Sequence, residues 1–251
     1  MKQSLVVLAA GQGTRMRSDL PKVLHPIAGA PMLLHALRAG EHLDPDRTVI
    51  VTGHGGEAVA GTARDWDETL LIAEQTEQLG TAHAVAQARP ALSDFDGDVT
   101  VLYGDTPFIR AETLERMAEA RAAGADVVVL GFEAADPTGY GRLLVEDGEL
   151  LRIVEHKDAS EAERAVTLCN SGVVMAPAEV LFSLVAEVGN DNAKGEYYLT
   201  DIVGIARSRG LSTRAVTCAE AETLGVNSRS DLAAAEAVFQ ARARAGLLDS
   251  G

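Results

Sequence analysis

The residues best suited to bind phosphate follow one apolar run near the N-terminus. Leu5–Ala10 leads directly into a glycine-rich turn, Gly11-Gln12-Gly13, and the cations that follow are Arg15, Arg17 and Lys22. Glycines let a backbone approach a ligand closely, and exposed N–H groups in such a turn can hold a phosphate. Because the chain has only 22 Lys and Arg in all, this concentration of cations favours an anionic ligand here, against the alternative of a plain tight turn with solvated arginines.

The turn fits neither of two well-known phosphate motifs. The dinucleotide fingerprint requires a third glycine where this chain has Met16, and the Gly-Lys-Ser/Thr of the Walker A loop is absent. The sequence therefore predicts a nucleotide held in another way, and it argues against a nicotinamide-dependent oxidoreductase.

A second group of candidate residues ends another apolar run. Val99–Tyr103 is followed by Gly104 and Asp105. Open α/β sheets bind ligands at the carboxyl ends of their strands, and an aspartate there can hold a divalent metal on a phosphate substrate. The structural alternative is a loop aspartate that caps the next helix.

The elements that position these residues alternate along the chain. Apolar runs predict strands at Leu5–Ala10, Thr48–Thr52, Thr69–Ala73, Val99–Tyr103, Asp126–Phe132, Val166–Met175 and Ser212–Thr217. Amphipathic stretches predict helices at Pro31–Leu43, Thr81–Arg89, Ala111–Ala123, Pro177–Val188 and Tyr197–Arg209. This alternation, with runs apolar on both faces, predicts an α/β fold whose mostly parallel sheet is covered by helices on both sides.

Two segments depart from the alternation. Gly141–Val145 and Glu149–Glu155, joined through Asp147-Gly148, predict a β-hairpin. With the strand Val166–Met175, this hairpin suggests a small β-rich lobe beside the sheet. Asp231–Arg244 predicts an Ala-rich terminal helix, an arm with Ser230 as its N-cap.

Composition excludes several classes of protein. The net charge is −15, which argues against binding to nucleic acid or to an anionic membrane surface. No apolar run approaches the roughly 20 residues of a membrane helix. Cys169 and Cys218 show no metal-ligand spacing, and two cysteines in a chain of 251 residues predict a cytoplasmic protein with reduced thiols.

The remaining polar clusters contain many hydrogen-bonding groups and few acids or bases. They are Gln75–His83, Asp136–Arg142, Glu155–Asp158, Asn170–Gly172, Gly195–Asp201 and Gly225–Asn227. No protease or esterase motif is present. Taken singly, each cluster is an ordinary turn; together they suit the binding of a base and a sugar.

These motifs resemble those of a known family. Leu8–Met16 followed by Asp19–His25 resembles the motif of sugar-nucleotide pyrophosphorylases. From about residue 5 to 230 the ordered clusters resemble the N-terminal uridyltransferase domain of bacterial N-acetylglucosamine-1-phosphate uridyltransferases. The departures are small: Gln12, Ala82 and Ser171 stand where lysine, glycine and threonine are usual.

The resemblance implies a fold, an activity and a division of the chain. The fold would be the Rossmann-like nucleotide-diphospho-sugar transferase fold with a sugar-binding lobe. Residues 1–228 would form the nucleotidyltransferase domain and residues 229–251 a helical arm. UTP and N-acetylglucosamine 1-phosphate would give UDP-N-acetylglucosamine, a precursor of peptidoglycan and lipopolysaccharide, and pyrophosphate.

The resemblance also implies roles for individual residues. The catalytic cations would be Arg15 and Lys22, and the ligands of Mg²⁺ would be Asp105 and Asn227. The nucleotide would contact Ala10, Gly11, Gly13, Lys22, Gln75, Gly80, Thr81, Tyr103 and Gly104. The sugar would contact Gly141, Glu155, Asn170 and Tyr198.

Two alternatives and one expectation about assembly remain. A related enzyme could use another sugar 1-phosphate or another base, or the chain could be a non-catalytic nucleotide-sugar-binding module. The hexapeptide repeats of an acetyltransferase β-helix are absent from the 251 residues, so a single activity is expected. Without that trimer-forming domain, a monomer or a weak dimer is expected.

Overall fold

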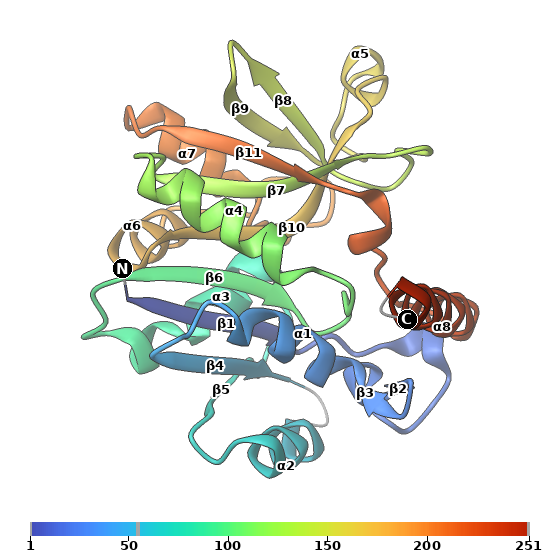
Figure 1. Cartoon of the computed structure of the whole chain (residues 1–251). Coiled ribbons are helices and arrows are strands. Elements are labelled where there is room, and N and C mark those ends of the chain that lie inside the picture. Colours follow the sequence, from blue (N-terminus) through green and yellow to red (C-terminus); the bar gives the residue numbers. More distant parts are fainter. Residues whose placement is uncertain (1, 54–55, 250–251) are drawn as a thin grey trace.

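The computed structural model describes residues 2–53 and 56–249, and its centre is a nine-stranded sheet (Figure 1). Seven strands run in the order β11-β7-β10-β6-β1-β4-β5, and the hairpin β8–β9 joins the sheet through β10. The strands are β1 (Gln3–Ala9), β4 (Arg47–Thr52), β5 (Leu71–Glu74), β6 (Asp98–Tyr103), β7 (Val127–Glu133), β8 (Arg142–Glu146), β9 (Glu149–Val154), β10 (Leu168–Pro177) and β11 (Thr213–Cys218). Because β10 alone runs antiparallel to its neighbours β6 and β7 on the main path, the predicted mostly parallel sheet is confirmed.

Helices cover both faces of the sheet, as the alternation predicts. One face packs against α1 (Met32–Glu41), α2 (Gly56–Trp66) and α4 (Ala111–Ala122). The other packs against α3 (Thr81–Gln87), α6 (Ala178–Val185) and α7 (Asp201–Ser208). The remaining elements are α5 (Glu161–Arg164), α8 (Arg229–Asp249), the short strands β2 (Pro26–Ile27) and β3 (Ala30–Pro31), and the 3-10 turns η1 (Thr14–Met16), η2 (Lys22–Leu24), η3 (Arg89–Leu92) and η4 (Glu220–Glu222).

The continuous apolar character of the strands follows from this double cover. In β1, Leu5 and Val7 lie in the core beneath α1, whereas Val6 and Leu8 lie in the core beneath α3. Successive side chains of a strand point to opposite faces, so a strand covered on both sides can be apolar at successive positions, as β1 is from Leu5 to Ala9.

The strand predicted at Val166–Met175 lies in a different place from the one expected. It is β10, and it occupies the middle of the main sheet between β7 and β6 instead of belonging to a separate lobe. Its first residues reach the hairpin, where Cys169 pairs with Arg142. The hairpin itself is confirmed: Asp147 and Gly148 both have positive φ, +51° and +81°, as its two-residue turn requires.

Helices α2 and α5 are not predicted by the apolar pattern of the sequence. Only Val59, Ala60 and Ala63 of α2 are buried, and no residue of α5 is. Apolar periodicity is the main sequence signal of a helix, and these short faces provide little of it.

The terminal helix begins earlier than predicted, so the assignment of Ser230 as its cap is wrong. Helix α8 starts at Arg229. The Ser228 hydroxyl accepts a hydrogen bond from the N–H of Asp231 at 3.2 Å, and the Asp231 carboxylate accepts one from the N–H of Ser228 at 2.9 Å. This reciprocal pair satisfies backbone donors in the way a capping box does.

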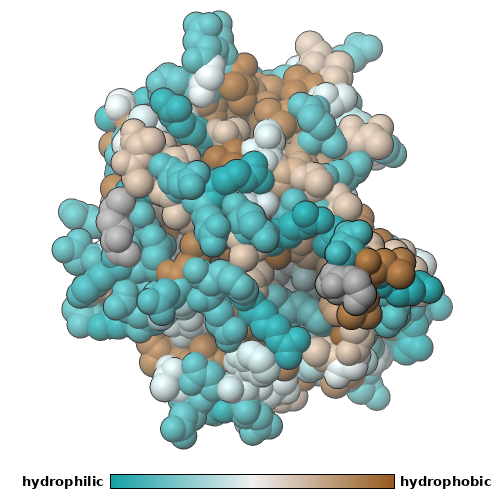
Figure 2. Space-filling model, viewed as in Figure 1, coloured by the Kyte–Doolittle hydropathy of each residue, from teal (hydrophilic) through white to brown (hydrophobic). Residues whose placement is uncertain are grey.

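Helix α8 packs on the body of the protein through its first half. A small core there contains Ile27, Met32, Phe108, Val226 and Ala235, with Leu232, Val238 and Phe239 packed against it. Its far end carries the exposed Leu248. The face drawn in Figure 2 is mostly hydrophilic, with hydrophobic residues gathered on α8 and around the hairpin β8–β9.

The two cysteines lie on strands that flank a third. Phe132 of β7 pairs with Cys169 of β10 on one side and with Cys218 of β11 on the other. Two strand spacings separate them by about 10 Å, which is too far for a disulfide. Of the helices that the structure describes, none has the length and hydropathy needed to cross a bilayer.

Candidate functional site

Most of the predicted nucleotide residues meet near the carboxyl ends of β1, β5 and β6. A cavity of about 300 Å³ lies there. It is lined by Leu8, Ala10, Gly11, Lys22, Val23, Gln75, Gln78, Gly80, Thr81, Ala84, Tyr103, Asp105 and Glu196. Parallel strands bring their carboxyl ends to one edge, which is where α/β sheets bind ligands.

Lys22 joins the two predicted metal ligands. Its ammonium donates a hydrogen bond to the Asp105 carboxylate and another, at 3.1 Å, to Oδ1 of Asn227. The side chains of Lys22 and Asp105 are only 10% and 20% exposed, so solvent screens this ion pair poorly. Two oxygen atoms from residues far apart in the sequence therefore accept hydrogen bonds from the same ammonium.

Backbone contacts explain why Asp105 and Asn227 meet. The N–H of Val226 donates to the carbonyl of Asp105 at 2.9 Å. The N–H of Asn227 donates to the carboxylate of Asp231 in α8 at 3.0 Å. The segment that follows β11 is thus fixed beside the end of β6 by the first turn of the terminal helix.

The donor set fits a hard divalent cation in part. A carboxylate and an amide oxygen are ligands that Mg²⁺ accepts, with phosphate oxygens and water completing its shell. Within residues 2–53 and 56–249, no group of three or more His, Cys, Asp or Glu could hold a metal ion. A metal at Asp105 and Asn227 would therefore complete its shell with oxygens of water or substrate.

The glycine-rich turn packs tightly on Lys22. A Cβ atom at Gly13, whose φ is +60°, would lie 2.6 Å from Cβ of Lys22. A Cβ atom at Gly104 would lie 3.2 Å from Cγ1 of Val23. Gly13 and Gly104 thus lie beside the cavity and shape its wall, although neither lines it.

Arg15 lies apart from the residues that line the cavity. It sits in the 3-10 turn η1 and is exposed, and it makes no hydrogen bond or ion pair with the residues that the structure describes. The turn is held by Arg229 of α8, which donates to the carbonyls of Met16 and Arg17 at 2.9 and 3.1 Å. The catalytic role of Arg15 remains a prediction.

Gln75, Gly80 and Thr81 form the opposite wall. The side-chain amide nitrogen of Gln75 donates to the carbonyl of Gly80 at 3.1 Å. Gly80 has φ +121°, and a Cβ atom there would lie 2.5 Å from the backbone oxygen of Tyr197. Only glycine allows this close approach.

Tyr103 lies between the nucleotide cavity and the predicted sugar residues. Burial raises the pKa of its phenol above the usual value, and the carboxylates of Asp105 and Glu155 raise it further. A Cβ atom at Gly172 would lie 2.7 Å from the Tyr103 ring. The pairing of β10 with β7 shifts register between Asn170 and Val174, so Gly172 lies in the kind of strand irregularity that often re-aims residues beside active sites.

Three of the predicted sugar residues lie together at the base of the hairpin. A Cβ atom at Gly141 would be 3.3 Å from Oε1 of Glu155 and 3.6 Å from Cβ of Asn170. The N–H of Asn170 donates to the carbonyl of Gly141 at 2.8 Å. Burial raises the pKa of Glu155, while the hydroxyl of Thr200, which donates to Oε1 at 3.3 Å, and the nearby Lys194 lower it.

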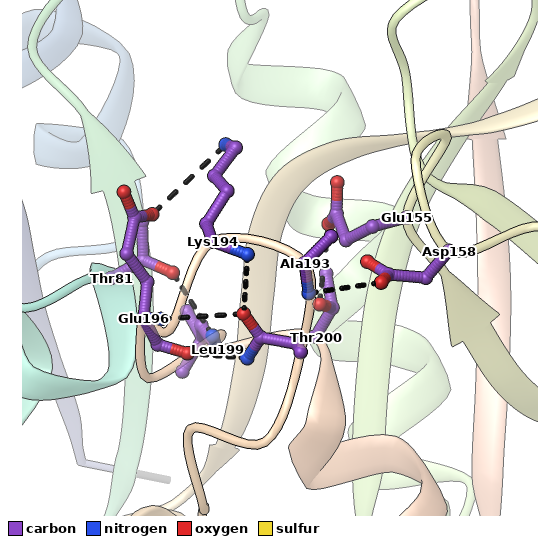
Figure 3. A network of polar contacts seen from close by, with 9 residues as sticks. Thr81, Glu155, Asp158, Ala193, Lys194, Glu196, Leu199 and Thr200 are labelled. Carbon is purple, nitrogen blue, oxygen red and sulfur yellow. Dashed lines mark hydrogen bonds and ion pairs between the residues drawn. The ribbon is translucent and has the colours of Figure 1, made fainter.

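The fourth predicted sugar residue, Tyr198, belongs to a loop that connects the two groups. Its ring is buried, and desolvation raises its phenol pKa to about 12. Figure 3 shows this loop between Thr81 on one side and Glu155 and Asp158 on the other. The Thr81 hydroxyl accepts from the N–H of Leu199 at 2.9 Å, and the N–H of Ala193 donates to Asp158 at 3.1 Å.

Several residues of the site were not singled out from the sequence. Gln78 and Glu196 line the cavity, Thr200 donates to Glu155, and Arg229 holds the turn that carries Arg15. Gln78, Glu196 and Thr200 stand in polar clusters that the sequence marks as a whole. Nothing in its spacing ties Arg229 to a turn more than 200 residues away.

Comparison with known proteins places this site in a family. Residues 5–171 match the family described as the MobA-like NTP transferase domain. The chain is 67% identical over 248 residues to the bifunctional protein GlmU of Cereibacter sphaeroides, covering 99% of this chain and 54% of that protein. It is 65% identical over 251 residues to GlmU of Ruegeria pomeroyi, covering 100% and 56%. The chain thus spans about half the length of these curated relatives.

Solved structures share the fold at low sequence identity. A UDP-glucose pyrophosphorylase complexed with UDP-glucose aligns with a TM-score of 0.72 at 17% identity, covering 96% of this chain and 100% of the other. An inositol-1-phosphate CTP transferase from T. maritima aligns with a TM-score of 0.70 at 17% identity, covering 92% and 91%. These likenesses confirm the predicted nucleotidyltransferase fold. Since the family match covers more than half of its residues, the chain belongs to the MobA-like NTP transferase domain family.

Proposed function

We propose that this chain transfers a uridylyl group from UTP to N-acetylglucosamine 1-phosphate. A phosphate oxygen of the sugar forms a bond to the α-phosphorus of UTP, and the bond from that phosphorus to the β-phosphate oxygen breaks. The products are UDP-N-acetylglucosamine and pyrophosphate. The high identity to proteins named GlmU and the resemblance of the motifs to bacterial uridyltransferases support the proposal.

The convergence of the predicted residues on one cavity is the observation that supports the proposal most strongly. Eight of the residues predicted for the nucleotide and the metal line a single cavity, and Lys22 brings Asp105 and Asn227 together at its edge. The predicted sugar residues Gly141, Glu155 and Asn170 form a second group. Tyr103 lines the cavity, and its ring packs against Gly172, which lies two residues after Asn170.

The wall formed by Gln75 suits a uracil base. Its amide nitrogen is engaged by Gly80 and by the ring of His83, which leaves the amide oxygen as an acceptor. Uracil and thymine carry an N3–H that can donate to this oxygen. Cytosine has no hydrogen on N3, so Gln75 would favour UTP and dTTP over CTP.

No general base is required for this reaction. The sugar phosphate is an anion at neutral pH and can attack directly, so the main task is to align two polyanions and to stabilise charge. Glu155 and Asn170 would hold the sugar. Lys22 and Arg15 would neutralise the α-phosphate and the departing pyrophosphate, where the charge grows toward the transition state.

Asp105 and Asn227 would hold Mg²⁺ in the complex with substrate. When bound, the ion would neutralise phosphate oxygens and fix their orientation. Asp105 would be its only protein carboxylate, so Asp105→Asn should remove nearly all activity. Asn227→Ala should have a smaller effect, because water can replace a neutral amide more easily.

A substrate panel tests the proposal. UTP, dTTP, CTP and ATP are each combined with the 1-phosphates of N-acetylglucosamine, glucose and glucosamine, and pyrophosphate release is measured with Mg²⁺ and with EDTA. UTP with N-acetylglucosamine 1-phosphate should be fastest, and EDTA should abolish release. A faster reaction with another pair would identify a related nucleotidyltransferase of different preference. Tight UTP binding without pyrophosphate release would indicate a non-catalytic module, and full activity in EDTA would refute the metal role.

A further inference from the structure

Arg142 is a buried cation that the proposed reaction does not use. It is 1% exposed and is one of the largest fully buried side chains of the protein. None of the ion pairs among residues 2–53 and 56–249 includes it. Burying a guanidinium without a carboxylate is costly, and an apolar side chain would fill the space without that cost.

The guanidinium binds neutral acceptors on three segments. Nη1 donates to the carbonyl of Tyr140. Nη2 donates to the carbonyl of Arg164 at 3.3 Å and lies 3.2 Å from Nδ1 of His156. A guanidinium has no acceptor, so Nδ1 of His156 must be the acceptor in this contact. Nε is buried and has no partner among the described residues.

These contacts are adjacent to the predicted sugar residues. Tyr140 precedes Gly141, and His156 follows Glu155. Across the sheet, Arg142 pairs with Cys169, which precedes Asn170. The guanidinium therefore bonds directly beside two of the predicted sugar contacts, at Tyr140 and His156. The third segment is joined through the backbone, where Arg142 pairs with Cys169 and the N–H of Asn170 donates to the carbonyl of Gly141.

We infer that Arg142 is a positioning residue that fixes Gly141 and Glu155 relative to each other in the sugar-phosphate subsite, and with Gly141 also Asn170, whose N–H donates to the carbonyl of Gly141. The inference rests on the proposed function for the identity of that subsite. Arginine suits the task because its planar fork directs several donors at once, whereas the ammonium of lysine is a compact point charge on a flexible stem. A buried polar group can be retained for the arrangement that it enforces rather than for stability.

The first test changes His156, which is only partly buried, so that the fold is retained. His156→Leu removes the acceptor of the guanidinium, whereas His156→Asn places an oxygen near the position of Nδ1. We expect His156→Leu to raise the KM for N-acetylglucosamine 1-phosphate by about tenfold with the KM for UTP unchanged, and His156→Asn to remain near the wild-type value. Arg152→Gln is the matched control, because Arg152 lies on the same hairpin, is exposed and, among the described residues, has Glu163 as its one side-chain partner.

The second test changes Arg142 itself. Arg142→Lys should increase hydrogen–deuterium exchange of the backbone in 138–141, 155–158 and 168–171, with exchange in β1 and β6 unchanged. The same variant should raise the KM for the sugar phosphate more than that for UTP. If it unfolds, His156→Leu is examined by exchange over the same segments.

The outcomes separate this inference from the proposed function. Equal rises in KM for both substrates, or unchanged exchange in the three segments, would overturn the role of Arg142 while leaving uridylyl transfer intact. If the wild-type protein releases no pyrophosphate with any sugar phosphate, the proposed function fails. The exchange measurement then still decides whether Arg142 holds these segments together.

Discussion

Lys22 occupies the place where a metal ion would join Asp105 to Asn227. In the structure its ammonium donates hydrogen bonds to an oxygen of each residue. A divalent cation at the same oxygens would repel this ammonium, so Lys22 must move away from Asp105 when a metal binds. Substrate phosphates would then provide its new partners.

This competition leads to a prediction about metal binding. Lys22→Met should bind Mn²⁺ more tightly than the wild-type protein when no nucleotide is present, because no ammonium then occupies Asp105 and Asn227. The same change should lower kcat by about 10²–10³-fold, as expected for the loss of one transition-state charge contact. Calorimetry and steady-state rates measure the two effects. Lys2→Met, at an exposed position, is the control.

Two results would count against this account of Lys22. One is Mn²⁺ affinity that Lys22→Met leaves unchanged or weakens. The other is a loss of kcat/KM caused entirely by KM, since a contact made mainly in the transition state should lower kcat.

Glu155 allows a prediction about pH. Burial raises its pKa in the folded protein, so folding favours the protonated form. The stability that this group contributes is therefore present below the unfolded pKa and is lost as the pH rises through the folded value. Glu155→Gln should raise the melting temperature at pH 9, and the gain should shrink as the pH falls toward 4. The variant should also bind the sugar phosphate more weakly, because it loses a charged acceptor.

Thermal unfolding from pH 4 to pH 9 measures this effect, with Glu146→Gln as control because Glu146 is exposed at the tip of the same hairpin. A gain in melting temperature that is larger at pH 4 than at pH 9 would show that the sign is wrong.

At the scale of elements, the loop before α3 depends on one glycine. Gly80 has φ +121°, and a Cβ atom there would collide with the backbone of Tyr197. Gly80→Ala should lower the free energy of unfolding by about 1–3 kcal/mol and should reduce activity, because Thr81 and the loop at Tyr197 would separate. Chemical denaturation measures the change. Gly61→Ala in α2, where a Cβ atom meets nothing within 4 Å, should instead stabilise by about 0.5–1 kcal/mol.

An activity of Gly80→Ala equal to that of the wild-type protein would show that this loop does not need its present position. A destabilisation by Gly61→Ala of the same size would show that glycine substitution itself, rather than the collision, lowers the stability.

Helix α8 holds the turn that carries Arg15 through Arg229. Its guanidinium holds the carbonyls of Met16 and Arg17, and this turn carries Arg15. Arg229→Ala should therefore lower kcat with little change in melting temperature. Arg244→Ala is the matched control, because Arg244 lies on the same helix and bonds to the carbonyl of Gln240 in that helix. An Arg229→Ala variant with wild-type kcat would mean that the turn keeps its shape without the helix.

The sequence predicts most elements because their signals are local. Strands such as Val99–Tyr103 are visible as buried β-branched runs, and the Asp147-Gly148 turn is visible as a hairpin signal. The place of β10 is not visible, because a strand has the same apolar pattern whether it pairs in the middle of a sheet or with a hairpin. Helix α2 is not visible either, since its buried face contains only Val59, Ala60 and Ala63.

The candidate site shows the same limit over longer distances. The turn at Gly11–Gly13 and the carboxylate of Asp105 stand out as strand-end motifs. The bond from Lys22 to Asn227 joins residues 205 positions apart, and no spacing rule connects them. The family resemblance alone implies their roles, a phosphate-neutralising cation for Lys22 and a metal ligand for Asn227. The burial of Arg142 could not be predicted for a further reason: arginine is mostly exposed and is almost never fully buried unless an acid pairs with it.

The whole molecule places two groups of residues on either side of Tyr103. The ends of β1, β5 and β6 hold predicted nucleotide residues, whereas the base of the hairpin β8–β9 and the start of β10 hold predicted sugar residues (Figure 1). The loop 193–200 is bonded to both groups through Thr81 and Glu155. This arrangement supports a reaction between two substrates whose neighbouring subsites are built by different parts of the chain.

The most direct test follows the oxygen atoms of the proposed reaction. N-acetylglucosamine 1-phosphate labelled with ¹⁸O in its phosphate is incubated with UTP, Mg²⁺ and the protein, and both products are analysed by mass spectrometry. Direct attack of the sugar phosphate on the α-phosphorus predicts UDP-N-acetylglucosamine that retains all of the label, together with unlabelled pyrophosphate. Labelled pyrophosphate, or no UDP-N-acetylglucosamine at all, would contradict uridylyl transfer at this site.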